Sequence, residues 1–171
     1  MVRRILLGCG IVSSVLYVVT DVLGTLRYDG YSYADQTFSE LTAQGAPTRP
    51  LMVALNGIPY TLLVTAFSRG VWTSAAPKRA ARITGAMLLG YAAFGMAGGV
   101  LFPMRPREAL AAGEETLRNV MHIPATAVSD VTVHCAGHGL WGHVARKAVP
   151  VLLVWDNRHA PRVGRFGRLT G

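Results

Sequence analysis

Charge is what this chain of 171 residues most lacks. Only 15% of its residues are charged, whereas a typical soluble domain has roughly 25%. Together with an apolar share of 51% and a mean hydropathy of +0.33, this deficit excludes a disordered chain and argues against a freely soluble domain. The two cysteines, Cys9 and Cys135, are too few for a disulfide-rich scaffold.

Three stretches are nearly or wholly without charge. Ile5 to Leu26 contains one charged residue, Asp21, while Leu51 to Ser68 and Ile83 to Met104 contain none. A helix that crosses a bilayer needs about 20 apolar residues, and the third stretch has no polar face of the kind that a soluble helix shows. We therefore predict an all-α, multi-pass transmembrane helical bundle with spans at about 5–26, 51–70 and 83–104, and a fourth segment that begins near residue 119.

The loop charges predict an orientation. The residues before the first span and those between the second and third spans hold six basic residues and no acidic ones. Residues 27–50 and 105–119, on the other side, hold five basic and six acidic residues. The positive-inside rule then places the N-terminus in the cytoplasm of a cell-membrane protein. The net charge of +8 is thus a topology signal, and we assign the lipid bilayer, and no nucleic acid, as a partner.

Several short motifs carry a resemblance to a known family. They lie late in the first span, in the loop after it, and around the end of the third span. Over about residues 5–128 the chain resembles the domain of unknown function 998 family of small prokaryotic integral membrane proteins. The resemblance implies a bundle of five or six spans and brings no reaction with it. Its motifs are Thr20-Asp21, Gly30-Tyr31-Ser32, Ser39-Glu40-Leu41, Gly45-Ala46-Pro47-Thr48-Arg49, Phe102-Pro103-Met104-Arg105 and Met121-His122.

The composition changes after Asp130. Residues 131–171 hold six of the 17 basic residues, four of the five histidines and one acidic residue, where the family pattern implies two more apolar spans. We hypothesise that the coding frame is shifted here. Read one base later, suitable codons for VPVLLV and the following Trp155 encode FRFYSY, and those for VTVHCAGHGLWGH encode a mostly apolar string. The alternative is a genuine basic, histidine-rich tail.

This segment also contains a group of residues that resembles a metal cluster. His134 and His138 are spaced by one helical turn, and Cys135 and His143 lie near them. Zinc needs three or four ligands that converge on one point, and a shifted frame would mean that none of these residues was selected as a ligand. We assign no metal site and no cofactor.

Asp21 is the most informative single residue. It lies roughly 8 Å from the middle of its span, which is inside the ~15 Å half-thickness of the hydrocarbon core. A lone carboxylate there is costly, so it should face the bundle and find a partner. The topology brings loop and helix-end residues to the same side. The predicted outward pocket consists of Asp21, Tyr31, Glu40, Arg105 and His122.

Three interpretations of this pocket stay open at the level of sequence. The first, which the residues favour most, is a structural pair, Asp21 with Arg105 or with His122, as in a purely structural membrane subunit. The second, our first hypothesis for a biochemical function, is an outward-facing site for a small molecule or lipid that uses Asp21 and Glu40. The third is an intramembrane metal-dependent hydrolase with Asp21, Glu40 and His122 as ligands. The sequence names no reaction and leaves the oligomeric state open.

Local signals predict three further details. Ser39 precedes Glu40 in a pattern typical of a helix N-cap. Pro59 should kink the second span. The Gly95 and Gly99 pair predicts close helix packing within the chain.

Overall fold

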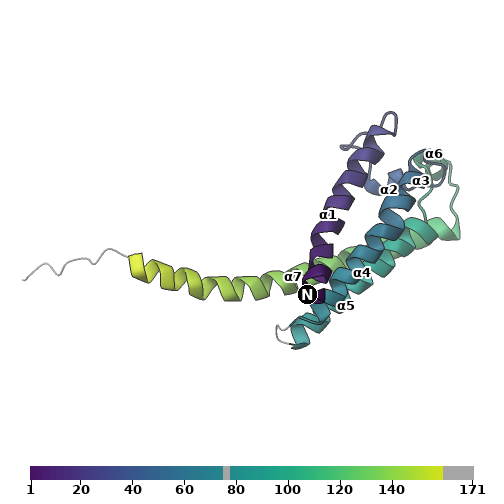
Figure 1. Cartoon of the computed structure of the whole chain (residues 1–171). Coiled ribbons are helices and arrows are strands. Elements are labelled where there is room, and N and C mark those ends of the chain that lie inside the picture. Colours follow the sequence, from purple (N-terminus) through teal and green to yellow (C-terminus); the bar gives the residue numbers. More distant parts are fainter. Residues whose placement is uncertain (75–77, 160–171) are drawn as a thin grey trace, which may run out of the picture.

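The computed structural model describes residues 1–74 and 78–159, and all regular elements in these residues are helical (Figure 1). The predicted all-α fold is therefore confirmed. Two five-residue π-helical turns, η1 and η2, interrupt the membrane helices. The elements in chain order are α1 (Val2–Leu26), α2 (Phe38–Leu41), α3 (Arg49–Met52), η1 (Val53–Gly57), α4 (Ile58–Trp72), α5 (Lys78–Met96), η2 (Ala97–Leu101), α6 (Arg107–Ala111) and α7 (Leu117–His159).

Three helical stretches are long and apolar enough to cross a membrane, namely Val2–Leu26, Arg49–Trp72 and Arg79–Leu101. They correspond to the three predicted spans. Their outward faces are apolar: Ile11 is 73% exposed and Leu62 64% exposed. Such faces are unfavourable in water and favourable against lipid tails, so this is the surface of a membrane protein.

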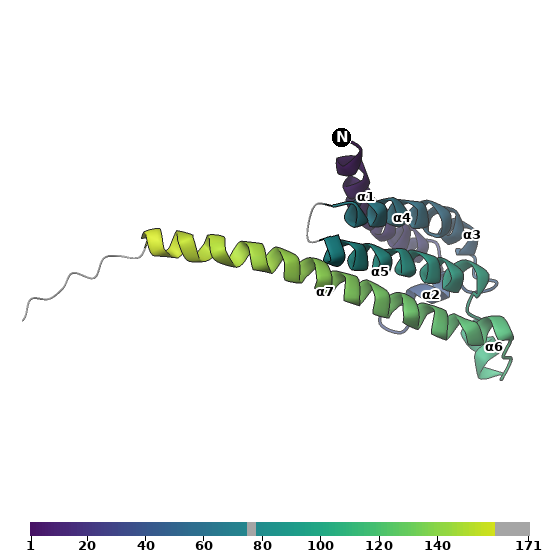
Figure 2. The same cartoon turned by 90° about the horizontal axis from the view of Figure 1, so that it is seen from below.

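The long helix α7 begins at Leu117 and has 43 residues. At 1.5 Å per residue it is about 65 Å long, roughly twice the thickness of a hydrocarbon core. Its first half runs along α5, and its second half extends away from the other helices (Figures 1 and 2). The change of composition at Asp130 falls within this helix. Residues 160–171 of the predicted tail lie outside the described residues, and the frameshift stays a hypothesis.

The four long helical segments pack in chain order. α1 packs on α4, α4 on α5, and α5 on α7, an order that can be followed in Figure 2. α1 and α7 therefore form the two edges of the row. Residues from both edge helices nevertheless line one cavity.

Glycines allow the close approach of these helices. A Cβ atom at Gly70 of α4 would lie 2.9 Å from the Leu6 Cβ and 3.1 Å from the Leu6 backbone carbon of α1. A Cβ at Gly95 would lie 3.2 Å from the Ser129 Oγ, whereas one at Gly99 would meet nothing within 4 Å. The predicted close packing within the chain is confirmed for Gly95 and is wrong for Gly99.

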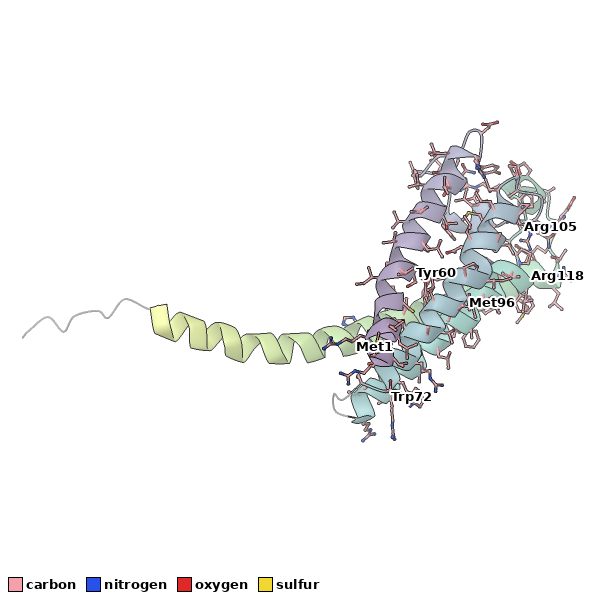
Figure 3. All side chains as sticks on the ribbon, in the orientation of Figure 1. Met1, Tyr60, Trp72, Met96, Arg105 and Arg118 are labelled. Atoms are coloured by element: carbon pink, nitrogen blue, oxygen red, sulfur yellow. The ribbon has the colours of Figure 1, made fainter. Side chains whose placement is uncertain are left out.

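Residues 27–50 and 102–116 form a cap over one end of the bundle. Figure 3 shows Arg105 and Arg118 near this end and Met1 and Trp72 near the other. The two loops of the cap are joined by a hydrogen bond from the Gln44 N–H to the Met104 carbonyl, 2.8 Å long. The side chain of Leu41, which is fully buried, fixes the cap to the helices below.

Two local predictions need adjustment. The N-cap of α2 is Thr37 and not Ser39. Thr37 and Glu40 form a capping box, in which the Thr37 N–H donates a hydrogen bond to the Glu40 carboxylate at 3.1 Å. Pro59 is the second residue after the π-turn Val53–Gly57. Proline has no N–H to donate to the preceding turn, so the helix changes its geometry at the position where the kink was predicted.

Candidate functional site

Glu40 is the centre of a polar network in the cap. Its side chain is 7% exposed and forms a bidentate ion pair with Arg107, with Nε–Oε2 and Nη2–Oε1 distances of 2.9 Å. The Gln36 side-chain amide and the Thr37 N–H also donate to this carboxylate, at 3.2 and 3.1 Å. Burial acts to raise the pKa of Glu40, but the hydrogen bonds from Thr37, Gln36 and Arg107 and the charge of Arg107 outweigh it, so the pKa lies below its ordinary value. This carboxylate is ionised and fully partnered.

A cavity of about 230 Å³ in the cap is lined by Glu40, Arg107 and Tyr28, among others. Its acid and base are already bound to one another, and Arg107 also donates to the Asp35 carbonyl. A charged ligand would have to break this pair, which is unfavourable because the Glu40 carboxylate is buried. We therefore regard the cap network as structural.

The predicted pairing of Asp21 is wrong. Asp21 accepts a hydrogen bond from the Tyr33 hydroxyl at 3.3 Å, and Arg105 instead forms an ion pair with Glu114. The His122 Nδ1 lies 3.0 Å from the Gly98 carbonyl and 2.8 Å from the Phe102 carbonyl. The reason is the helix order, because α1, which carries Asp21, and α7, which carries His122, are at opposite edges of the row.

The predicted ligand set of a metal-dependent hydrolase is likewise not brought together. Asp21, Glu40 and His122 each have a different partner. Within the described residues no group of three or more His, Cys, Asp or Glu side chains is arranged to hold a metal ion. No observation favours this interpretation.

Tyr31 lies among the other loop tyrosines. Its ring meets the Tyr33 ring edge-on at a centroid distance of 5.4 Å, and its hydroxyl donates to the Gln36 carbonyl at 3.4 Å. Burial, the charge of Asp21, the neighbouring Tyr33 and the charge of Glu40 raise the pKa of Tyr31. Of the predicted pocket, Asp21, Tyr31 and Glu40 thus share one electrostatic environment, in which the phenol stays neutral.

A second cavity, which we call the central cavity, lies between the membrane helices. Its volume is about 250 Å³, and α1, α4, α5 and α7 all contribute to its wall. Apolar side chains such as Met52 and Val53 form part of the wall, and polar side chains form the rest. The polar and aromatic lining residues are Tyr17, Phe38, Ser39, Thr42, Asn56, Tyr60, Thr61, Tyr91, His122, Thr126, Ser129 and Asp130.

The central cavity reaches the middle of the membrane region. Tyr17 and Tyr91 lie about 14–15 Å from the cap ends of their helices, and Asp130 about 20 Å from the start of α7, at 1.5 Å per residue. The half-thickness of a hydrocarbon core is ~15 Å. Figure 3 likewise shows Tyr60 between the two ends of the bundle. Polar groups therefore line a cavity at a depth where polar groups are unfavourable unless partnered.

Both π-helical turns contribute to this wall. Asn56 and Gly57 come from η1, and Gly99 and Val100 come from η2. A π-turn alters the regular helical hydrogen bonds, and such turns are frequent at functional sites. Side chains bond to carbonyls in both regions: the Thr61 hydroxyl donates to the Gly57 carbonyl at 2.5 Å, and His122 contacts the Gly98 carbonyl.

The cavity contains acceptor atoms that are free to receive a hydrogen bond. The Asn56 Oδ1 is buried and has no hydrogen-bond partner. Because the His122 Nδ1 faces two carbonyls, it must carry the proton, which leaves Nε2 as an acceptor in the neutral ring. Neither of the two ion pairs formed by described side chains involves Asp130, and no lysine or arginine is among the lining residues.

Sequence reasoning found only part of this site. His122 lines the central cavity and Glu40 the cap cavity, while Asp21, Tyr31 and Arg105 line neither. A usable signal was present, since each missed residue lies roughly 7–13 positions from the cap end of its span, which is ~10–20 Å. The residues that sequence reasoning missed are Tyr17, Asn56, Tyr60, Tyr91 and Asp130.

The comparison with known families agrees with this architecture. The family described as "Protein of unknown function (DUF998)" matches residues 11–162. The chain belongs to the DUF998 family. The match extends beyond residue 128, where the resemblance was expected to end, and it includes every residue that lines the central cavity. No curated protein and no solved structure matches the chain. The family description states no reaction, so the function of this DUF998 protein has to be argued from its cavity.

Proposed function

We propose that this DUF998 protein is a multi-pass protein of the cell membrane that binds a small molecule or a lipid headgroup in the central cavity. The observation that carries the proposal is the buried, unpartnered Asn56 Oδ1 in a cavity of about 250 Å³ at mid-membrane depth. Leaving a buried polar group without a partner costs about 1–3 kcal/mol. A ligand that donates a hydrogen bond to Asn56 would offset this cost.

The cavity wall supports a binding site more than a packing defect. Empty cavities left by packing are lined by apolar side chains, whereas this one carries a carboxylate and an imidazole from α7 and an amide from η1. Ligand sites combine a mostly apolar wall with a few placed polar groups. The central cavity fits this description, whereas in the cap cavity the Glu40 carboxylate is already paired with Arg107.

The proposed route of entry follows from the helix order. Tyr17 of α1 and Asp130 of α7 both line the cavity, although these helices are the two edges of the row. A ligand would enter between them, below the cap. The loop charges place the N-terminus in the cytoplasm and the cap outside the cell, so the ligand would come from the outer half of the bilayer or from outside.

Cysteine labelling tests whether the cavity is a hydrated site. In a protein with Cys9 and Cys135 replaced by alanine, Thr61→Cys places a thiol in the cavity wall, and Leu62→Cys places one on the lipid-facing surface. We expect a membrane-impermeant trimethylammonium methanethiosulfonate, added to intact cells, to label Thr61→Cys and not Leu62→Cys. An unlabelled Thr61→Cys protein, or equal labelling at both positions, would contradict the proposal.

The same reagent tests the orientation. Glu108 lies in the cap, and Thr73 lies at the other end of the bundle, and both are exposed. With the cap outside, Glu108→Cys reacts in intact cells, and Thr73→Cys reacts only after the cells are opened. The reverse pattern would overturn the predicted topology.

A further inference from the structure

The central cavity also indicates the chemical class of its ligand, and this inference rests on the function proposed above. Its polar wall is rich in acceptors and lacks fixed cations: the Asn56 amide oxygen is unpartnered, and no lysine or arginine lines the cavity. An anionic ligand would meet the Asp130 carboxylate with no compensating base. A ligand with N–H donors or a positive charge is the complementary partner.

Asp130 is the residue that most strongly indicates the charge of the ligand. It is exposed and lines the cavity at about 20 Å from the cap end of α7, and it takes part in neither ion pair among the side chains that the structure describes. A carboxylate at membrane depth is unfavourable without a counter-charge. Its presence beside a cavity is explained if a bound cation acts as its counter-ion.

Aromatic rings form the adjoining wall. The Tyr17 ring stacks on Phe38 at a centroid distance of 4.9 Å and meets Tyr60 at 5.8 Å, and Tyr60 meets Tyr91 edge-on at 6.3 Å. All four rings line the cavity. The faces of aromatic rings attract cations, and clusters of such rings beside a carboxylate are suited to ammonium groups.

We infer that the central cavity binds an organic ammonium group, with Asp130 as its counter-ion and the tyrosine rings around it. The Asn56 Oδ1 and the His122 Nε2 accept hydrogen bonds where the ammonium carries protons. At about 250 Å³ the cavity is smaller than a typical site for a drug-sized ligand, so it holds a headgroup or a small amine. The ammonium can belong to a free amine or to an aminophospholipid, and the experiment separates these sources.

The experiment measures how well probes protect Thr61→Cys from the trimethylammonium reagent, in bilayers of phosphatidylglycerol. The probes are benzylammonium and benzyltrimethylammonium, with neutral benzyl alcohol and anionic benzoate as controls of similar size. We expect the cations to protect at concentrations about tenfold lower than benzyl alcohol does. Addition of phosphatidylethanolamine tests the lipid source, and protection by it alone would assign the ammonium to a lipid headgroup.

Variants of Asp130 give the decisive comparison. Asp130→Asn should remove the preference for the cations, Asp130→Glu should retain it, and Asp21→Asn, outside the cavity, should leave it unchanged. If benzyl alcohol or benzoate protects as well as the cations, or if Asp130→Asn keeps the preference, the ammonium inference is wrong while the cavity remains a binding site. If Thr61→Cys is not labelled at all, the proposed function itself fails.

Discussion

The cap and the central cavity differ in how their polar groups are partnered. In the cap, the Glu40 carboxylate receives hydrogen bonds from Thr37, Gln36 and Arg107. In the cavity, the Asn56 Oδ1 has no partner, and Asp130 has no ion pair among the described side chains. Groups that are fully partnered hold the fold together, whereas groups left without partners in a cavity are available to a ligand. This contrast separates scaffold from site in this protein.

The largest expected effect comes from breaking the cap network. Glu40→Ala removes a buried carboxylate that accepts hydrogen bonds from Thr37, Gln36 and Arg107, and we expect it to lower the free energy of unfolding by about 2–3 kcal/mol. The measurement is thermal or denaturant unfolding of the purified protein in detergent. Glu114→Ala is the matched control, because its ion pair with Arg105 involves a side chain that is 58% exposed and should contribute less than about 1 kcal/mol. Equal effects of the two changes would remove the distinction between a buried network and a surface pair.

The pH dependence of stability also tests whether the Glu40 carboxylate stabilises the fold. Because the pKa of Glu40 is lower in the folded protein than its ordinary value of 4.5, its ionised form stabilises the fold. This contribution is fully present above pH 4.5 and is lost as the pH falls through the lowered pKa of the folded state. Stability measured from neutral pH downward should therefore fall less steeply below pH 4.5 in Glu40→Gln than in the wild type. Identical acid profiles would show that the carboxylate is not preferentially stabilised.

A substitution in the central cavity should have the opposite effect on the free energy of unfolding from one in the cap. Asn56→Leu removes an unpartnered buried polar group, so we expect the unliganded protein to become more stable by about 1 kcal/mol, while protection of the cavity thiol by cations weakens. The matched cap variant is Thr48→Val, since the buried Thr48 hydroxyl donates to the Leu41 carbonyl at 2.8 Å. Thr48→Val should destabilise by about 1 kcal/mol. A loss of stability in Asn56→Leu as large as in Thr48→Val would place Asn56 in the scaffold.

The sequence was sufficient for the membrane helices and insufficient for the site. The stretches without charge predicted α1, α4 and α5, because a helix that spans the lipid core needs about 20 residues with few charges. It did not reveal the partners of Asp21 and Arg105, since these depend on how a loop folds back over the helices. Tyr33 and Glu114 are loop residues whose positions no helical period determines.

The central cavity was missed for a related reason. Its residues come from four helices, and only the packing order and the two π-turns bring Tyr17, Asn56 and Asp130 to one space. Asp130 in particular was interpreted as the boundary of a changed segment, although it lies within a continuous helix. Sequencing the coding DNA across codons 125–171 tests the frameshift hypothesis directly, because a shifted frame would open two apolar spans beyond this residue.

The smallest expected effect concerns Asp21, the residue that the sequence made most prominent. Its contact is an exposed hydrogen bond with the Tyr33 hydroxyl, 3.3 Å long, so Asp21→Asn and Tyr33→Phe should each change the free energy of unfolding by about 0.5 kcal/mol or less. In the double variant Asp21→Asn/Tyr33→Phe, the change in the free energy of unfolding should differ little from the sum of the two single changes, apart from the loss of this one contact. A loss of about 2 kcal/mol or more in Asp21→Asn alone would mean that this carboxylate has a buried partner in the membrane. Asp21 would then be a structural residue, as Glu40 is. An acidic residue within a membrane span would then not be enough to identify the binding site.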